Sequence, residues 1–335
     1  MRVTAKQIAK DLGISEATVS LVFNNKPGVS EQMQRRVNSY ADELRRKSEM
    51  VANYNNSSIK VISLLSKRYL YDKDTVSFYT VIMMEITRFA SIAGYNVISV
   101  FVHNIEEIRN TIEQSKHDRT CGFILHAADM TDDQIRLFYR QDIPTVVCDY
   151  ESDNIEMDYI YFNNIQAVNL ALKHLFDMGH RDIVYFYNSE QIYNFLTRRE
   201  TFENTMRRSG QPISMIEMGT KIEEIYTNIV HYIKSAPKLP TAVLSENYAI
   251  SAATIKAFQD CGYKIGKDIS IIGIDELPFH MLMDFDFTYV KVMFKSKGYF
   301  TIKRLLEKIN DKRKDTARIV IDNTLVVGNS VCRIT

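Results

Sequence analysis

The chain has 335 residues, of which 45% are hydrophobic and 25% charged, as in ordinary soluble proteins. This length predicts about two domains with a small additional module. The 42 basic side chains nearly balance the 41 acidic ones, which excludes a polycation, and no apolar run reaches the roughly 18 residues of a membrane span. No apolar segment follows the charged start, and the four cysteines are far apart without metal-ligand spacing, so we expect a cytoplasmic protein with free thiols and no membrane contact.

The charge is unevenly distributed. The first 50 residues hold nine basic and six acidic side chains, so a basic segment precedes a slightly acidic remainder. Such a segment is typical of nucleic-acid contact, although so small an excess does not decide the matter alone.

Three short helices are predicted in this segment. Thr4 and Gln7 fit a capping box, and Gly13 can end the first helix in a left-handed turn. Ser15 is placed to begin a second helix and Ser30 a third. The apolar side chains expected to form their common core are Ile8, Ala9, Leu12, Val19, Val22, Phe23, Met33, Val37, Tyr40, Ala41 and Leu44. The pattern indicates a helix-turn-helix unit, and a solvated three-helix cap is the alternative.

With that core turned inward, the second helix exposes small side chains near its start. Glu16, Ala17, Ser20 and Leu21 lie on this outer face. Such a face suits the major groove of DNA, because the backbone can approach the base edges closely.

The residues of this segment closely resemble the head of LacI/GalR-type transcriptional repressors. The similarity is carried by Val3–Lys10, Gly13–Ser15, Ala17–Ser20, Asn24 and Gly28–Ser30. It implies that the second helix enters the major groove of operator DNA. It places base-reading roles on Glu16, Ala17 and Leu21. The phosphate-binding positions that it implies are Thr4, Ser15, Thr18, Ser20, Asn24 and Ser30.

The next segment departs from the family pattern. Relatives carry a proline-containing hinge that folds on operator DNA and wedges a leucine into the minor groove. Here Val51 and Ala52 match and are assigned to DNA contact, whereas Ser48 replaces the proline and Asn55 the leucine. Because Asn is a poor helix former and a poor wedge, we expect a linker that is flexible without DNA. A plain polar tether is an equal alternative.

From residue 59 onward, short β-branched runs alternate with amphipathic helices. The expected strands are Lys60–Leu65, Asn96–Val102, Gly122–His126, Thr145–Cys148, Asp182–Tyr187, Thr241–Ser245, Ile269–Ile274 and Arg318–Val327. The expected helices are Phe78–Ala93, Ile105–Ser115, Asp132–Gln141, Gln166–Met178, Arg199–Ser209, Ile222–Ser235, Ala249–Asp260 and Lys297–Asn310. Such alternation builds parallel sheets, and this number of strands predicts two lobes with a cleft between them.

This part also resembles the LacI/GalR family, through His174–Leu175, Met178–Arg181, Pro240–Val243, Ile272–Glu276 and Thr288–Val290. The implied fold is an all-α helix-turn-helix head plus an α/β two-lobed domain like type I periplasmic binding proteins. The predicted boundaries are a head over 1–46, a linker or atypical hinge over 47–58, and an effector-binding and dimerisation domain over 59–335. Within that domain, lobe 1 covers about 59–162 and 291–320, and lobe 2 about 163–290 and 321–335.

Ligands of two-lobed α/β proteins lie at the carboxyl ends of strands. By resemblance, Arg198 grips effector oxygens, since a guanidinium suits paired oxygen acceptors. Asn247 matches the first member of an Asn–Asp pair, and Asp149 and Asp275 match acidic positions at strand ends.

Four further residues bear on the kind of effector. Tyr248 stands where sugar binders carry Asp, which removes an acceptor for sugar hydroxyls. Phe294 can supply an apolar platform for a ring, and Lys67 and Arg68 follow the first strand of the body. Together they favour an anionic or modified sugar, or no sugar, over a simple neutral hexose.

Motifs for nucleotide cradles, nucleophile elbows and zinc-dependent hydrolysis are absent from the sequence, so we expect no cofactor, no metal and no enzyme. The resulting hypothesis is a homodimeric repressor that binds double-stranded operator DNA and responds to a sugar-like or anionic sugar-derived effector. The alternatives are a solute-binding protein without DNA function and a sugar-modifying enzyme.

Overall fold

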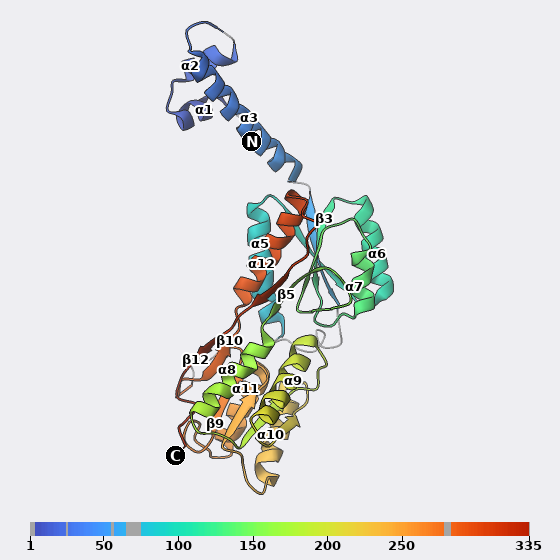
Figure 1. The fold of residues 1–335 in the computed structure, drawn as a ribbon, viewed down its shortest axis with the longest axis vertical. Coiled ribbons are helices and arrows are strands. Elements are labelled where there is room, and N and C mark those ends of the chain that lie inside the picture. Colours follow the sequence, from blue (N-terminus) through green and yellow to red (C-terminus); the bar gives the residue numbers. More distant parts are fainter. Residues whose placement is uncertain (1–3, 25, 55–56, 65–74, 278–282, 335) are drawn as a thin grey trace.

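The computed structural model describes residues 4–24, 26–54, 57–64, 75–277 and 283–334. A helical head, lobe 1 and lobe 2 follow one another along the long axis of the molecule (Figure 1). The architecture confirms the predicted class, a helix-turn-helix head followed by a two-lobed α/β body.

The head consists of α1 (Ala5–Leu12), α2 (Glu16–Phe23) and the start of α3 (Glu31–Tyr54). Gly13 ends α1 with φ +66°, the left-handed conformation expected of it. The buried side chains that join the three helices are Ile8, Ala9, Val19, Val22, Val37 and Ala41. Phe23 was expected in this core but is 41% exposed, because it is the last residue of α2 and lies beyond the packed face.

The backbone of α3 continues through Lys47–Tyr54, which differs from the flexible linker predicted there. The replacement of the family's proline by Ser48 explains the difference, since a helix-interior proline removes a backbone donor and clashes with the preceding turn. Asn55 lies outside the described residues.

Lobe 1 contains a six-stranded parallel sheet in the order β11-β5-β4-β3-β1-β2. Its strands are β1 (Ser58–Leu64), β2 (Asn96–Val102), β3 (Thr120–His126), β4 (Thr145–Cys148), β5 (Asp158–Phe162) and β11 (Arg318–Ile321). Its helices are α5 (Thr75–Ile92), α6 (Ile105–His117), α7 (Asp132–Tyr139) and α12 (Phe294–Asn310).

Lobe 2 repeats this plan with the strand order β12-β10-β9-β8-β6-β7, and only β12 runs antiparallel to its neighbour. Its strands are β6 (Ile183–Tyr187), β7 (Ser214–Glu217), β8 (Ala242–Ser245), β9 (Ser270–Ile274), β10 (Thr288–Lys291) and β12 (Thr324–Val326). Its helices are α8 (Asn164–Asp177), α9 (Tyr193–Arg208), α10 (Ile222–Ser235) and α11 (Tyr248–Asp260). The sequence did not predict β5, β7 or β10, which are short and lack a long run of β-branched residues.

The chain passes between the lobes three times within the described residues, after β5, β10 and β11. The prediction of one strand over Arg318–Val327 was therefore wrong, because β11 and β12 belong to different sheets. Asn323 lies between them, and its backbone N–H donates to Gln166 Oε1 at 2.6 Å. Its side-chain amide donates to the carbonyl of Asn163 at 2.8 Å, which fixes this crossing against the start of α8.

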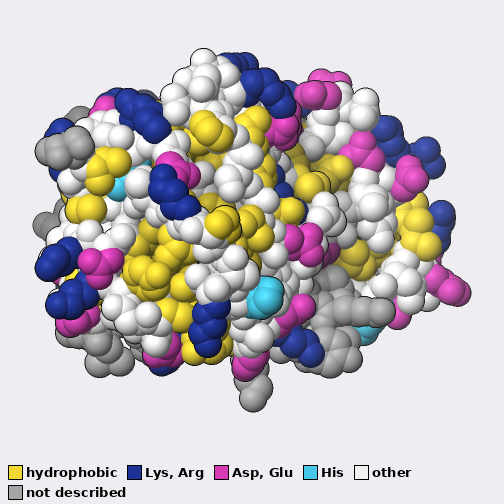
Figure 2. Space-filling model, turned by 90° about the horizontal axis from the view of Figure 1, so that it is seen from below, with side chains coloured by type: hydrophobic (Ala, Val, Ile, Leu, Met, Phe, Trp, Pro, Cys, Tyr) yellow, Lys and Arg dark blue, Asp and Glu magenta, His cyan; other side chains and the backbone are white. Residues whose placement is uncertain are grey.

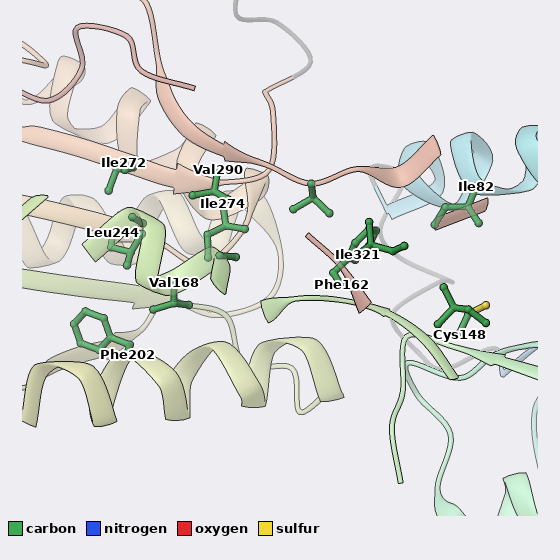
Figure 3. Close-up of a cluster of buried hydrophobic side chains, with 14 of the residues drawn as sticks. Ile82, Cys148, Phe162, Val168, Phe202, Leu244, Ile272, Ile274, Val290 and Ile321 are labelled. Carbon is green, nitrogen blue, oxygen red and sulfur yellow. The ribbon is translucent and has the colours of Figure 1, made fainter. Parts of the chain in front are cut away.

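The largest hydrophobic cluster extends through both lobes (Figure 3). Phe202 and Leu244 belong to its lobe 2 part, Cys148 and Ile82 to its lobe 1 part, and Phe162 lies near the first crossing. Because burial of such side chains is the main favourable term in folding, this shared cluster helps to hold the lobes together.

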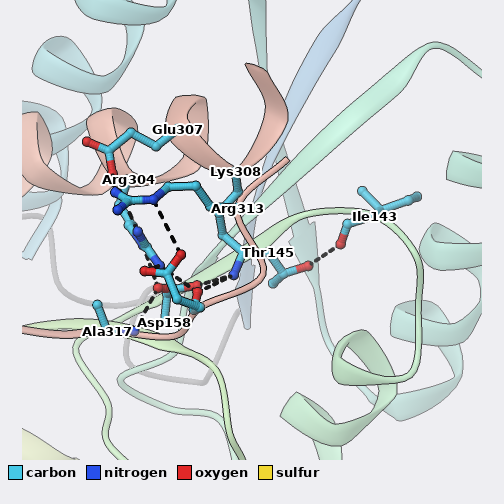
Figure 4. Close-up of polar contacts among 9 residues, drawn as sticks. Ile143, Thr145, Asp158, Arg304, Glu307, Lys308, Arg313 and Ala317 are labelled. Carbon is cyan, nitrogen blue, oxygen red and sulfur yellow. Dashed lines mark hydrogen bonds and ion pairs between the residues drawn. The ribbon is translucent and has the colours of Figure 1, made fainter. Parts of the chain in front are cut away.

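The buried carboxylate of Asp158 binds α12 and the segment that leads from it into β11, and so holds both to lobe 1 (Figure 4). Asp158 has no exposed surface, accepts a hydrogen bond from Arg304 Nε at 2.6 Å and pairs with Lys308. The backbone N–H of Ala317 donates to the same carboxylate at 3.0 Å, so β11 is guided to the edge beside β5.

Among the described helices, none combines the length and apolar character that crossing a membrane requires. All four cysteines are free thiols, and Cys148 is the buried one.

Candidate nucleic-acid interface and ligand cleft

The outer face of α2 and the helix starts around it carry the residues assigned to DNA. Glu16, Ala17 and Ser20 are exposed, and Thr18 and Leu21 are half-buried. Thr4, Ser15, Asn24 and Ser30 are also exposed. For Val51 and Ala52, only the helical backbone is described.

Three of these hydroxyl groups cap helices. Thr4 Oγ1 accepts from Gln7 N–H at 3.3 Å, Ser15 Oγ from Thr18 N–H at 3.1 Å, and Ser30 Oγ from Met33 N–H at 3.3 Å. A hydroxyl that accepts from the backbone keeps its own proton for donation. The Thr4 and Ser30 hydroxyls are therefore prepared to donate to a phosphate at a helix start, where unpaired N–H groups also favour anions. Ser15 Oγ also lies 2.8 Å from Thr18 Oγ1, so these two hydroxyls share one hydrogen bond.

A cleft between the lobes is formed at the carboxyl ends of the central strands, and its empty space, including the open mouth, is about 860 Å³. Six of the eight predicted effector residues line it, namely Asp149, Arg198, Asn247, Tyr248, Asp275 and Phe294. Lys67 and Arg68 lie outside the described residues.

We define the lobe 1 wall of this cleft as His126, Asp149, Phe162, Phe294 and Lys297. Asp149 is buried and pairs with the buried ammonium of Lys297, while His126 Nε2 lies 3.3 Å from Asp149 Oδ2. Burial alone would raise the pKa of Asp149, but the charge of Lys297 and the His126 contact outweigh it and lower that pKa. The rings of Phe162 and Phe294 pack edge to face, with centroids 5.2 Å apart.

We define the lobe 2 wall as Asn194, Arg198, Asn247, Tyr248 and Asp275. Arg198 Nη1 lies 3.7 Å from Asp275 Oδ2, and it donates to the carbonyl of Glu246 at 2.7 Å. Asp275 Oδ1 is buried and has no hydrogen-bond partner within the described structure. Burial raises the pKa of Asp275 and outweighs the attraction of Arg198.

A buried ion pair supports the lobe 2 wall from behind. Arg199 Nε donates to Glu246 Oε1 at 2.8 Å, and Arg199 Nη2 donates to the carbonyls of Asn188 and Glu190, each at 2.8 Å. The adjacent Asn247 caps α11 by accepting from Ile250 N–H at 3.0 Å. These contacts fix the backbone on which the cleft side chains are mounted.

Two consecutive residues at the start of α9 connect the lobes. The hydroxyl of Tyr193 donates to Glu151 Oε2 at 2.9 Å, and Asn194 Nδ2 donates to Asp149 Oδ1 at 3.3 Å. Because Glu151 and Asp149 belong to lobe 1, a change in the angle between the lobes alters both bonds.

Of the residues that form the two walls, sequence reasoning did not identify Lys297, His126, Phe162 or Asn194. His126 ends a predicted strand, and the rule that ligands lie at the carboxyl ends of strands could have identified it. Lys297 and Asn194 lie within helices and gave no such signal. No group of metal-ligating side chains occurs among the described residues.

Residues 4–45 match the sequence profile of the bacterial regulatory proteins of the lacI family, and residues 172–331 match that of a periplasmic binding protein-like domain. The chain is 28% identical to the HTH-type transcriptional repressor PurR of Pasteurella multocida, over 98% of each chain. The chain belongs to the LacI family. The family assignment makes it a DNA-binding transcriptional repressor with an effector-binding domain, and not an enzyme.

Solved structures agree with this fold. A Lac repressor dimer bound to operator and the anti-inducer ONPF superposes on this LacI-family repressor with a TM-score of 0.71 at 20% identity, covering 99% of this chain and 100% of the other. A ribose-bound LacI family regulator from Enterococcus faecium gives 0.69 at 19% identity, covering 82% and 100%.

Proposed function

We propose that two heads of a homodimer read the two halves of a palindromic operator through the exposed face of α2. Glu16 accepts from a cytosine amine, Leu21 packs on a thymine methyl group, and Ala17 allows close approach to the bases. The capping hydroxyls and Asn24 bind phosphates. Pairing of the chains is supported by large exposed apolar side chains on α5, since Met84 is 66% and Ile92 74% exposed.

The surface at the lobe 2 end also supports pairing of two chains (Figure 2). Hydrophobic side chains gather near the middle of that face, with charges of both signs around them. The Lac repressor structure of the same fold is itself described as a dimer on operator.

Unbiased selection of duplex fragments followed by fluorescence anisotropy tests operator binding. If the dimer neutralises about ten phosphates, log K falls against log salt with a slope near −9. E16A changes the preferred base at one position in each half-site, whereas E31A, which removes the matching first-turn acid of α3, leaves the preference unchanged. A slope near zero, or no preferred fragment, contradicts the proposal.

We also propose that the cleft binds a small, uncharged ring compound, such as a sugar or sugar derivative, that carries hydroxyl or N–H donors. The observation that carries this proposal is the buried, unpartnered Oδ1 of Asp275, which a ligand donor would satisfy. The edge-to-face pair of Phe162 and Phe294 supplies an apolar surface for a ring. The described lining cations, Lys297 and Arg198, already face carboxylates, so these residues do not favour an anionic sugar.

A thermal-shift screen of the full-length protein tests the effector class, with sugars, sugar phosphates, uronates and purine bases as separate arms. Purines belong in the screen because a flat base with N–H donors meets the same two requirements. Neutral sugars or bases are expected to stabilise the wild type and to lose at least tenfold in affinity in D275N. Stabilisation only by sugar phosphates or uronates would reject this effector class.

Removing residues 1–58 separates the two activities. The truncated chain is expected to keep effector binding and to lose operator binding. A solute-binding protein without DNA function would bind its ligand equally with and without residues 1–58 and would bind no operator in either form.

A further inference from the structure

Each lobe places one aspartate at the same position of its sheet. Asp149 follows β4 and Asp275 follows β9, which are the third strands in the two equivalent strand orders. Both residues have left-handed backbone conformations, with φ +60° for Asp149 and +81° for Asp275. Such conformations are costly for residues other than glycine and tend to occur at functional sites. The surrounding structure therefore holds both carboxylates in the cleft.

A side chain of the protein itself supplies the positive charge on the lobe 1 wall. Lys297 is 1% exposed, its ammonium pairs with Asp149, and its Nζ lies 4.2 Å from the centroid of the Phe162 ring. A carboxylate and an aromatic face together form a recognition site for an ammonium ion. The remaining contacts of Asp149 come from His126 and Asn194, so both carboxylate oxygens have partners.

We propose that Lys297 determines the specificity of the cleft, because its ammonium fills a cation subsite formed by Asp149 and Phe162 and keeps ligand donors off the lobe 1 wall. This inference rests on the proposed effector cleft. The effector then donates to Asp275 on the lobe 2 wall and presents an apolar face to lobe 1. Ligand amines are excluded, since a second positive charge beside Lys297 is repelled.

Truncation of the lysine side chain exposes the subsite to a matched probe. K297A removes three methylene groups and the ammonium, which are the atoms of propylammonium. In the full-length protein, propylammonium chloride is expected to raise the Tm of K297A by at least about 2 °C more than equal sodium chloride does. 1-Propanol, which matches the probe without its charge, is expected not to do so.

Two further proteins complete the experiment. The wild type is expected to show no propylammonium effect, because Lys297 fills the subsite. K297A/D149N is expected to show none either, because the carboxylate that attracts the probe is gone. Equal shifts in K297A and the wild type, or in K297A and the double variant, would overturn the proposal.

K297A leaves a buried carboxylate without its partner, so the variant can fail to fold. In that case the readout is the yield of soluble dimer after refolding, which propylammonium is expected to raise and 1-propanol is not. K297M/D149N lacks both charges, is expected to fold, and must refold independently of the probe. Equal yields of K297A with both additives contradict the proposal.

These measurements need no natural effector. If the ligand screen fails while propylammonium rescues K297A, the cation subsite stands and the proposed effector function does not. If an effector binds but propylammonium has no effect on K297A, the proposed effector function stands and the cation subsite does not.

Discussion

The two walls of the cleft place a carboxylate in equivalent positions and surround it differently. In lobe 1, Asp149 is paired with Lys297 and both of its oxygens have partners. In lobe 2, Asp275 lies 3.7 Å from Arg198 and keeps one buried oxygen without a partner. An unpaired buried acceptor costs about 1–3 kcal/mol, and a ligand that donates to it recovers this cost. Under the proposed function, one fold repeated twice uses its carboxylate for internal stability in lobe 1 and for effector binding in lobe 2.

The largest effect is expected from removing the guanidinium of the lobe 2 wall. R198A removes the guanidinium that faces Asp275 and the donors to Asn164 and to the Glu246 carbonyl. Each buried acceptor left without its donor costs about 1–3 kcal/mol of unfolding free energy, and effector binding should be lost as well. Urea unfolding measures the first effect and calorimetry the second.

R207A is the matched control for R198A on the same helix. Its guanidinium is exposed and pairs with Glu203 across one turn, so its removal should cost under about 1 kcal/mol. Similar losses in the two variants would mean that the wall arginine is not held as described.

The two aspartates are expected to respond to pH with opposite signs. Folding lowers the pKa of Asp149, so its contribution is present above the ordinary carboxyl value near 4 and is lost as pH falls through the folded pKa. D149N should therefore be most destabilised relative to wild type at neutral pH and least in acid. Unfolding free energies of the variant and the wild type between pH 3 and pH 7 test this.

Folding raises the pKa of Asp275, so its ionisation opposes folding as pH rises above the ordinary value. D275N should lose little stability at neutral pH, or gain some, while it loses effector affinity. A larger destabilisation by D275N than by D149N at pH 7 would reverse the roles assigned to the two walls.

The smallest effect is expected at the contact that joins the lobes. Y193F removes the hydrogen bond to Glu151 and leaves the ring against Tyr150 and Tyr161, which should cost about 1 kcal/mol. Because the bond joins the lobes, the variant should also change effector affinity. Y226F, which removes a bond to Asp260 inside lobe 2, should leave affinity unchanged.

The head was the most predictable region, because capping residues and 3,4 spacing are local signals. Phe23 was wrongly predicted to be buried, because the spacing does not show where the neighbouring helices cease to cover α2. In the body, alternation of strands and helices predicted two lobes, but the short strands β5, β7 and β10 have too few residues to show an alternating pattern. Arg318–Val327 was read as one strand because periodicity does not reveal that the chain changes sheets at Asn323.

In the cleft, the strand-end rule and the family resemblance brought Asp149, Asp275 and Arg198 into consideration. Lys297 escaped notice because it lies 148 residues from Asp149 along the chain, and only the packing of α12 on lobe 1 brings the two together. Which side chain pairs with a buried carboxylate depends on tertiary packing, so the sequence around a lysine in a helix does not predict that it forms such a pair.

The three passages of the chain between the lobes have a mechanical consequence. Because three backbone segments join the two sheets, we expect the lobes to move relative to each other mainly by bending at these segments. An effector that closes the cleft would then turn the outer end of lobe 1, where α3 joins β1, by an angle set by this geometry. In the proposed homodimer, such a movement would change the spacing of the two heads on DNA, whatever the chemistry of the molecule that triggers it.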